Sequence, residues 1–290
     1  MPPGLELRTL AAGDEPPIEA FLARYPNTSM FLQSNMRKAG FEDRGQPFGG
    51  TWVAAISEGR VVAAAQLAWN GMLILQAPEH AESIAGFAVA RAPRPLRGLI
   101  GPQAQVDRAR RALGIADELL RTAKAEHLFA LALGELRLPA SLAGGEVVCR
   151  LARAADLAEL TGWRVAFSIE VVGAAPGPSL EAEATESIQR ALAEGSMFVL
   201  ERRGALVACS GFNARIPDAV QVGGVWTPPE LRNRGYARAA VAGSLQIARA
   251  EGAARAILFT DERNLPAIRA YTSLGFRVVG DYALLFLRER

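Results

Sequence analysis

The sequence predicts an α+β fold in which one unit, a mixed and mostly antiparallel sheet flanked by helices, occurs twice in tandem. The same order of strand and helix patterns runs through both halves of the 290-residue chain. Three short segments of the first half also match segments of the second half in the same order. The matched segments are 8–14 with 150–156, 51–67 with 197–212, and 76–79 with 227–230. Any one match could be chance, but three in one order indicate a repeat.

In the first half, hydrophobic periodicity and turn residues predict a strand, two helices, a three-stranded meander and a further helix, strand and helix. The first two strands of the meander form a hairpin across the turn residues 57–60. The predicted strands are Leu5–Leu10, Trp52–Ile56, Val61–Leu67, Met72–Gln76, Leu96–Gly101 and His127–Leu138. The predicted helices are Ile18–Tyr25, Met30–Gly40, Ala81–Arg91 and Gln103–Leu113.

The second half repeats this order, with a hairpin turn at 202–204. The predicted strands are Glu146–Leu151, Met197–Glu201, Ala205–Phe212, Val220–Thr227, Ala254–Thr260 and Phe276–Leu287. The predicted helices are Asp156–Ile169, Leu180–Ala193, a long helix from about Ala237 to Ala248, and Leu265–Leu274. Pro139–Gly145 is small and flexible in composition, which suits a linker, so we divide the chain into domains 1–140 and 146–290.

Composition narrows the class of protein. Half of the residues are apolar and the formal net charge is +2, which favours a soluble globular protein and disfavours nucleic-acid or membrane-surface partners. No apolar run approaches membrane-spanning length, and the start MPPGLELR has no secretory pattern, so a cytoplasmic location is expected. Two isolated cysteines and two histidines have no metal-ligand spacing, so no metal is expected.

One stretch, from Val220 to Arg238, indicates the chemistry. A buried strand ends at Pro228-Pro229, because proline cannot donate to a sheet ladder, and a glycine-containing loop then leads into a long helix. Free N–H groups and about half a positive charge collect at a helix N-terminus. Gly235 has no Cβ to keep an anion away. The stretch therefore predicts a phosphate-binding site.

The motifs of the second half resemble those of the GNAT superfamily of N-acetyltransferases. Arg232-x-x-Gly235-x-Ala237, placed between a strand and a helix, fits the Arg/Gln-x-x-Gly-x-Gly/Ala loop of that family. A second, independent signature follows as Asn264, Ala267, Tyr271 and Gly275-Phe276. The resemblance covers the second half well and the first half as a degenerate copy. In length and tandem layout the chain also resembles mycothiol synthases, two-copy members of the superfamily.

The resemblance implies an acyl-CoA donor, most often acetyl-CoA. Backbone amides from about Arg232 to Arg238 would cradle the pyrophosphate, with Arg232 and Arg234 adding charge, although Arg234 also fits a solvated surface position. The strand at Val225–Thr227 would pair with pantetheine and diverge from Leu258–Thr260, so that the thioester enters the wedge between them. The implied cofactor-binding residues are Val225, Trp226, Thr227, Arg232, Asn233, Arg234, Gly235, Tyr236, Ala237, Arg238 and Asn264.

Tyr271 is the implied general acid, because its family counterpart protonates the leaving CoA thiolate. Its place on an apolar helix stripe with Ile268 and Leu274 equally fits a packed aromatic. Asn264 has two expected roles, as the cap of the last helix or as a contact to the cofactor.

The general base is open. Histone acetyltransferases of the family have a glutamate on the strand before the loop, and Gln221 stands at that position here. Glu170 and Asp218 are candidate replacements, each also consistent with a surface carboxylate, and a water chain is the third possibility. We expect direct attack of a neutral amine in a ternary complex, since neither cysteine lies in a nucleophile motif.

The two copies differ at the loop. Arg232, Gly235 and Ala237 align with Ala81, Ile84 and Gly86, so the first copy lacks the arginine and places a bulky residue where phosphate should approach. The second copy is therefore expected to be catalytic and the first to be a scaffold.

The acceptor is expected to be an amine on a small molecule or peptide. The family places it against the first two helices and their loop, here about Arg164–Leu180, a segment that is neutral and unspecific. Two alternatives are acyl transfer of the mycothiol-synthase type to a larger acceptor, and a non-catalytic acyl-CoA sensor, which Gln221 keeps open.

Overall fold

The computed structural model describes residues 4–288, which form two compact units. Residues up to His127, together with those from Gly280 onward, make up the first unit. Leu128–Val279 make up the second unit. No helix in the described part of the chain is long and apolar enough to span a membrane.

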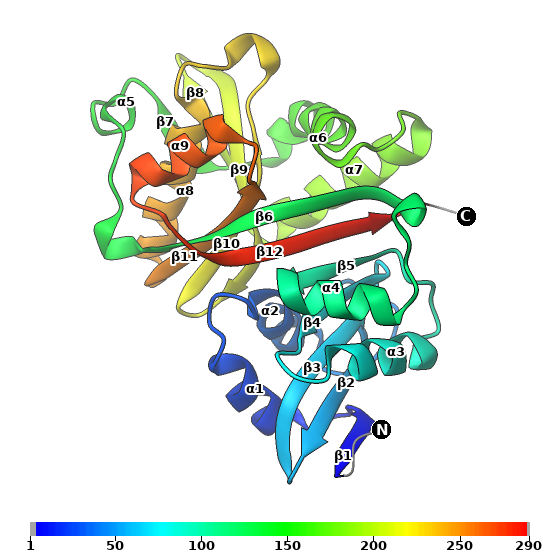
Figure 1. The fold of residues 1–290 in the computed structure, drawn as a ribbon. Coiled ribbons are helices and arrows are strands. Elements are labelled where there is room, and N and C mark those ends of the chain that lie inside the picture. The colour runs from blue at the N-terminus through cyan, green and yellow to red at the C-terminus, as the bar shows by residue number, and fades with distance from the viewer. Residues whose placement is uncertain (1–3, 289–290) are drawn as a thin grey trace. The chain divides into compact units, whose positions relative to one another are not determined.

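The first unit is a sheet with helices on its faces (Figure 1). Strands β1 to β4 pair antiparallel in sequence order, and β4 pairs parallel with β5. Its strands are β1 (Leu5–Thr9), β2 (Gly50–Ser57), β3 (Arg60–Ala68), β4 (Met72–Gln76) and β5 (Gly98–Pro102). Its helices are α1 (Glu15–Ala23), α2 (Met30–Ala39), α3 (Ala81–Arg91) and α4 (Gln103–Ala112), with a 3₁₀ turn at Asp117–Leu119.

The second unit repeats this plan with the same pairing. Strands β7 to β10 pair antiparallel in sequence order, and β10 pairs parallel with β11. Its strands are β7 (Val148–Leu151), β8 (Met197–Arg202), β9 (Ala205–Ile216), β10 (Ala219–Trp226) and β11 (Arg255–Asp261). Its helices are α5 (Ala140–Ala143), α6 (Leu157–Val172), α7 (Pro178–Ala193), α8 (Tyr236–Ala250) and α9 (Leu265–Leu274), with 3₁₀ turns at 133–135, 154–156 and 229–231. The predicted α+β repeat is confirmed.

Helices cover both faces of the second sheet. On one face, α8 packs over β7 to β10, and apolar side chains of α8 and α9 join a core with those of β10 and β11. On the other face, α6 and α7 pack together and form a separate core with Met197, Val199, Cys209 and Trp226 of the strands. The sheet therefore has two buried faces, and its strands read as nearly continuous apolar runs.

One matched sequence segment has the same structure in both units. Arg150 forms a bidentate ion pair with Asp156, at 2.7 and 3.0 Å, and the Arg153 N–H donates to Asp156 Oδ2 at 2.7 Å. Arg8 pairs with Asp14 in the first unit, and the Ala11 N–H donates to Asp14 Oδ2 at 2.9 Å. Equal spacing and equal contacts show that this match is a structural repeat.

The strand that ends each half of the sequence pairs with the sheet of the other unit's sequence half. Strand β12 (Arg277–Leu287) ends the chain, but Tyr282–Phe286 pair antiparallel with β5 of the first unit. Strand β6 (Leu120–Ala132) ends the first half, and it is the neighbour of β11. The compact units are therefore not contiguous halves. The division into 1–140 and 146–290 stays a prediction about where the two sequence copies meet.

Two local expectations are wrong. The strand predicted over 127–138 is β6, which begins at Leu120 and ends at Ala132. From 122 to 126 the small alanines are exposed and the polar side chains are partly or fully buried, so hydrophobicity does not reveal the alternation. The expected flexible linker, Pro139–Gly145, contains the helical turn α5, and Leu142 packs against the core of the second unit.

Candidate active site

Strands β10 and β11 separate in the middle of the second unit. Their parallel pairing covers Ala219–Gln221 against Arg255–Ile257 and ends there, although β10 continues to Trp226 and β11 to Asp261. The predicted divergence of these strands is confirmed. Beyond Gln221, the edge of β10 that faces β11 has no ladder partner within the described residues, so it can pair with an extended molecule that carries amides.

A bulge bends β10 at the same place. Its register against β9 shifts after Gln221 and again between Gly223 and Trp226, and Gly224 has a φ of +60°. Such bulges aim strand residues in new directions next to binding sites. Gly223 is glycine for a different reason than Gly224. A Cβ on Gly223 would lie 1.9 Å from Asn213 Nδ2. The Asn213 side chain therefore occupies the space above Gly223.

The loop after β10 forms a cradle of N–H groups at the start of α8. Asn233 and Gly235 have φ angles of +63° and +78°, and the chain from Asn233 to Gly235 is exposed. Within residues 4–288, the backbone N–H groups from 233 to 238 donate to no other group, since the first bond of this helix is Ala239 N to Gly235 O. A cradle of unpaired N–H groups at a helix N-terminus suits an anion.

Arg232, the residue before the cradle, contacts the end of β10 and helix α6. Its Nε donates to the carbonyl of Thr227 at 3.1 Å, and its guanidinium pairs with both Oε atoms of Glu170 at 2.9 Å. The same guanidinium lies over the Trp226 ring, 4.8 Å from the centroid. Arg232 thus joins the loop to the C-terminal end of α6. Arg234 extends from an exposed position and donates to the Glu230 carbonyl at 3.3 Å.

Two buried polar atoms near the cradle have no hydrogen-bond partner. They are Thr227 Oγ1, at the end of β10, and Arg238 Nε, in the first turn of α8. Buried polar atoms normally have partners, and an orphan calls for an explanation such as an absent ligand. Their positions fit a molecule that runs along β10 and ends at the cradle. The residues present therefore fit acetyl-CoA.

Helix α9 brings Asn264 and Tyr271 to the second unit's core. The Asn264 side chain accepts from the Ala267 N–H at 3.2 Å, so its expected role as a helix cap is confirmed. Tyr271 is partly buried, with its ring edge-on to Phe129 at 6.3 Å and to Phe276 at 6.1 Å. These contacts fix the ring and fit both expected roles, packed aromatic and proton donor.

The candidate bases have other contacts. Glu170 is held by Arg232, and Asp218 lies just before β10, at the opposite end from the loop, where it pairs with Arg255 at 3.3 Å. The eight residues of β10 separate Asp218 from the loop, and a strand of that length spans about 25 Å. Gln221 is buried, and its Nε2 donates to the carbonyl of Val222 at 2.7 Å. None of the three is placed as a free base.

Neither cysteine is prepared as a nucleophile. Burial raises the pKa of the Cys149 and Cys209 thiols to about 12, far above neutral pH. A thiol in that state holds almost no thiolate, which is the reactive form. Direct transfer without a covalent enzyme intermediate stays a prediction.

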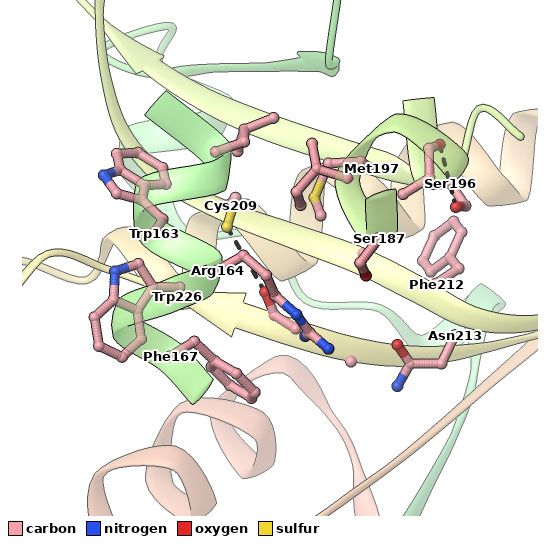
Figure 2. A pocket seen from close by; sticks show the side chains of 16 residues that line it. Trp163, Arg164, Phe167, Ser187, Ser196, Met197, Cys209, Phe212, Asn213 and Trp226 are labelled. Atoms are coloured by element: carbon pink, nitrogen blue, oxygen red, sulfur yellow. Dashed lines mark hydrogen bonds between the residues drawn. The ribbon is translucent and has the colours of Figure 1, made fainter. Parts of the chain in front are cut away.

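A pocket of about 90 Å³ that opens to solvent lies between α6, α7 and the face of β8 to β10 (Figure 2). Aromatic and aliphatic side chains make up most of its wall, and polar groups enter from Arg164, Ser187 and Asn213. Gly223, Gly224 and Trp226 line one side, so the pocket adjoins the bulge of β10.

The first unit lacks the cradle altogether. Four residues, 77–80, connect β4 to α3, whereas nine residues, 227–235, connect β10 to α8. The alignment of Ala81 and Ile84 with loop residues is therefore wrong, since both are buried within α3. Helix α4 also contacts the end of β4 in the first unit. Gln105 Oε1 accepts from the Ala77 N–H at 2.6 Å, and the Arg108 guanidinium donates to the Ala77 carbonyl at 3.0 Å.

The second unit has small residues where α4 has these two. Counted from the helix start, Gln105 and Arg108 are the third and sixth residues of α4, and Ala267 and Ala270 are those of α9. Alanine cannot reach across to the strand end. The space beside β10 therefore stays open in the second unit and is closed in the first.

The acceptor segment expected from the sequence, about Arg164–Leu180, includes the pocket residues Arg164 and Phe167, but the pocket residues of α7 and of β8 to β10 were missed. The segment around Arg164 reads as neutral, and Asn213 reads as the end of a strand. One signal was available, a single arginine in the middle of an otherwise apolar part of α6. Tertiary structure was needed to bring Asn213 and the glycines of β10 opposite this arginine.

Comparisons with known proteins agree with this geometry. Residues 165–276 match the model of the acetyltransferase (GNAT) family. A Drosophila protein of known structure covers 97% of this chain and 98% of its own, with 13% identity and a TM-score of 0.67. A GCN5-related N-acetyltransferase from Sphaerobacter thermophilus covers 98% and 96%, with 16% identity and a TM-score of 0.58. A tandem GNAT protein from the clavulanic acid biosynthesis pathway covers 98% of both chains, with 14% identity and a TM-score of 0.57. No curated protein sequence matches the chain.

The diverging strands, the cradle and the flanking helices define the second unit as an acyltransferase fold of the GNAT type. The family match covers residues 165–276 of the second unit, and the chain as a whole shares its fold with the tandem GNAT protein. Members of this family are acyl-CoA N-acetyltransferases.

Proposed function

We propose that this protein transfers an acetyl group from acetyl-CoA to a primary amine. The observation that supports this most is the unpaired edge of β10, which leads directly to the N–H cradle at 233–238. Pantetheine would pair with Val225–Thr227, and the pyrophosphate would lie on the cradle. Asn264 would contact the cofactor only with its remaining hydrogen-bonding capacity, because its Oδ1 already caps α9.

The reaction would proceed in a ternary complex. The neutral amine attacks the thioester carbonyl carbon and forms the C–N bond, and the C–S bond then breaks with its electron pair on sulfur. Tyr271 donates its phenolic proton to that sulfur and releases CoA as the thiol. Water takes the proton from the new amide nitrogen and returns one to Tyr271, so no carboxylate base is needed.

The test is the substitution Tyr271→Phe, which keeps the ring contacts with Phe129 and Phe276 and removes the proton. Acetyl-CoA should bind almost as before, while CoA release with an amine panel falls about 10²- to 10⁴-fold. Turnover within about threefold of the parent would assign Tyr271 to packing alone. Absence of CoA release by the parent, with any amine, would contradict the proposed reaction.

A second candidate is a non-catalytic acyl-CoA sensor. The buried Gln221, at the position where related enzymes have a carboxylate, is the observation that favours it. The two candidates make different predictions in one assay. A sensor binds acetyl-CoA and returns it unchanged, whereas the enzyme releases the thiol in proportion to the amine added.

A further inference from the structure

The pocket between α6, α7 and β8 to β10 contains one positive charge and no negative one. Arg164 is the only basic residue among the sixteen residues that line the pocket, and no aspartate or glutamate lines it. The walls come from Trp163, Phe167, Trp226 and aliphatic side chains. This composition suits a molecule with an anionic group and an apolar body.

The guanidinium of Arg164 has no protein partner among the described residues, and none of its nitrogens is fully buried. Within the described residues it makes no hydrogen bond or ion pair, and its contact is with the Phe167 ring, 5.4 Å from the centroid. Figure 2 shows its end directed into the pocket, toward the part that the Asn213 side chain also reaches. Arg150 and Arg232, by contrast, each pair with a carboxylate.

Asn213 adds a second donor on the opposite wall. Its side-chain amide makes no hydrogen bond in the described part of the chain, and its position depends on the missing Cβ of Gly223. A guanidinium and an amide that converge from α6 and β9 offer several N–H donors to one group. Planar carboxylates are the anions that such forked donors bind well.

Burial around Arg164 adds to the argument. Burial lowers the pKa of its guanidinium from the ordinary value, and the nearby Arg190 acts in the same direction. The side chain is half-buried, so the fold keeps a partly desolvated cation that has no carboxylate partner among the described residues. A cost of this kind is common where a side chain has a binding role, because the ligand supplies the missing charge.

We propose that this pocket recognises a carboxylate on the acceptor, so that the substrate is an amino acid or a similar molecule with an apolar side chain. Arg164 pairs with the carboxylate, Asn213 donates to it, and Trp163, Phe167 and Trp226 surround the apolar part. The bulge at Gly223–Gly224 lies beside the bound molecule, so its amine can approach the wedge between β10 and β11. The role of the bound molecule as acyl acceptor rests on the proposed function. Its recognition through a carboxylate does not.

The experiment measures binding without acetyl-CoA. The probes are two matched pairs, 3-phenylpropanoate with 3-phenylpropanamide and 4-methylpentanoate with 4-methylpentanamide. Each pair differs only in the anionic group. Binding is followed by calorimetry and by tryptophan fluorescence, because Trp163 and Trp226 line the pocket. The variants are Arg164→Met and the control Arg190→Met, which removes a nearby charge from a residue outside the pocket.

The parent should bind each carboxylate at least about 10-fold more tightly than its amide, as expected for a charge-assisted bond. Arg164→Met should remove that preference, and Arg190→Met should keep it. Equal binding of acid and amide by the parent, binding of neither up to millimolar concentration, or a preference that survives in Arg164→Met would each overturn the proposal. If Arg164→Met does not fold, Asn213→Ala replaces it and should reduce the preference by about threefold or more.

A second arm separates this proposal from the proposed function. CoA release is measured with L-phenylalanine and with phenethylamine, which lacks the carboxylate. A carboxylate preference in binding, without CoA release from any amine, would leave the pocket assigned and contradict only the acetyltransferase. CoA release without a carboxylate preference in the titration would contradict only the inference about the pocket.

Discussion

Gly235 and Gly252 lie at the two ends of α8, and they allow the anion cradle to be tested with a matched pair. Both have positive φ angles, +78° and +100°, so any side chain is strained at either position. Neither added Cβ would meet a close neighbour, since only Arg238 Nη2 comes within 4 Å, at 3.7 Å from Gly235. The two glycines differ in one respect, which is that Gly235 belongs to the cradle.

We predict that Gly235→Glu abolishes acetyl-CoA binding and that Gly252→Glu leaves it within about threefold of the parent. A carboxylate in the cradle would occupy the N–H groups and repel phosphate. Calorimetric titration of the parent should give one site per chain, because the first unit lacks the loop and α4 fills the equivalent space. A second site, or a site that survives in Gly235→Glu, would contradict this account.

At the scale of elements, the repeated Arg–Asp pair fixes the turn that enters α6. Asp156 is almost buried, and the hydrogen bond from Arg150 holds the pKa of its carboxyl below the ordinary value of 3.8. A group with a lowered pKa in the folded state stabilises the fold at pH above that ordinary value. The contribution is lost as pH falls through the lower, folded-state pKa. This part of the stability therefore begins to decline below about pH 4 and is gone once the pH is below the folded-state pKa.

Asp156→Asn should lower the stability of the second unit at pH 7 by about 1–3 kcal/mol and reduce its dependence on pH below 4. Asp14→Asn is the matched control in the first unit, where Arg8 and Asp14 are more exposed, and it should cost less than about 1 kcal/mol. Urea unfolding between pH 7 and pH 3 measures both effects. Equal acid sensitivity of Asp156→Asn and the parent would show that this pair does not set the pH dependence.

At the scale of the whole molecule, each unit takes part of its core from the other half of the sequence. Leu285, from the last strand of the chain, is 4% exposed and packs in the core of the first unit with Leu99 and Val106. Leu131, from the end of the first half, is 3% exposed and packs in the core of the second unit. The order of residues along the chain therefore does not predict which unit a substitution affects.

Leu285→Ala and Leu131→Ala test this exchange as a reciprocal pair. Each removes a buried leucine and should destabilise its unit by about 2–5 kcal/mol. In hydrogen exchange, Leu285→Ala should accelerate the amides of β2 to β5, and Leu131→Ala those of β10 and β11. Acceleration of the second unit by Leu285→Ala, with the first unit unchanged, would mean that the halves do not exchange strands in solution.

The sequence determined most of the elements and the loop before α8, because these depend on local signals. Strand alternation, the prolines after β10 and the glycine before α8 are properties of neighbouring residues, and they place the loop 227–235 without tertiary information. The repeat is also visible, since the Arg–Asp motif recurs with equal spacing. The family signatures at Arg232 and Tyr271 imply acetyl-CoA from sequence alone.

Only the tertiary structure decided the strand exchange, the missing loop of the first unit and the pocket beside α6. Strand β6 was misplaced because from 122 to 126 its alanines are exposed and its polar side chains are partly or fully buried, so hydrophobicity gave the wrong boundary. The first unit has a shorter loop than the second. Aligning the two sequence copies without a gap therefore places Ile84 of α3 opposite a loop residue, Gly235. Arg164 and Asn213 are 49 positions apart, and each looks ordinary alone. The fold brings them to one cavity without a counter-charge, and that juxtaposition is a property of packing that no local pattern encodes.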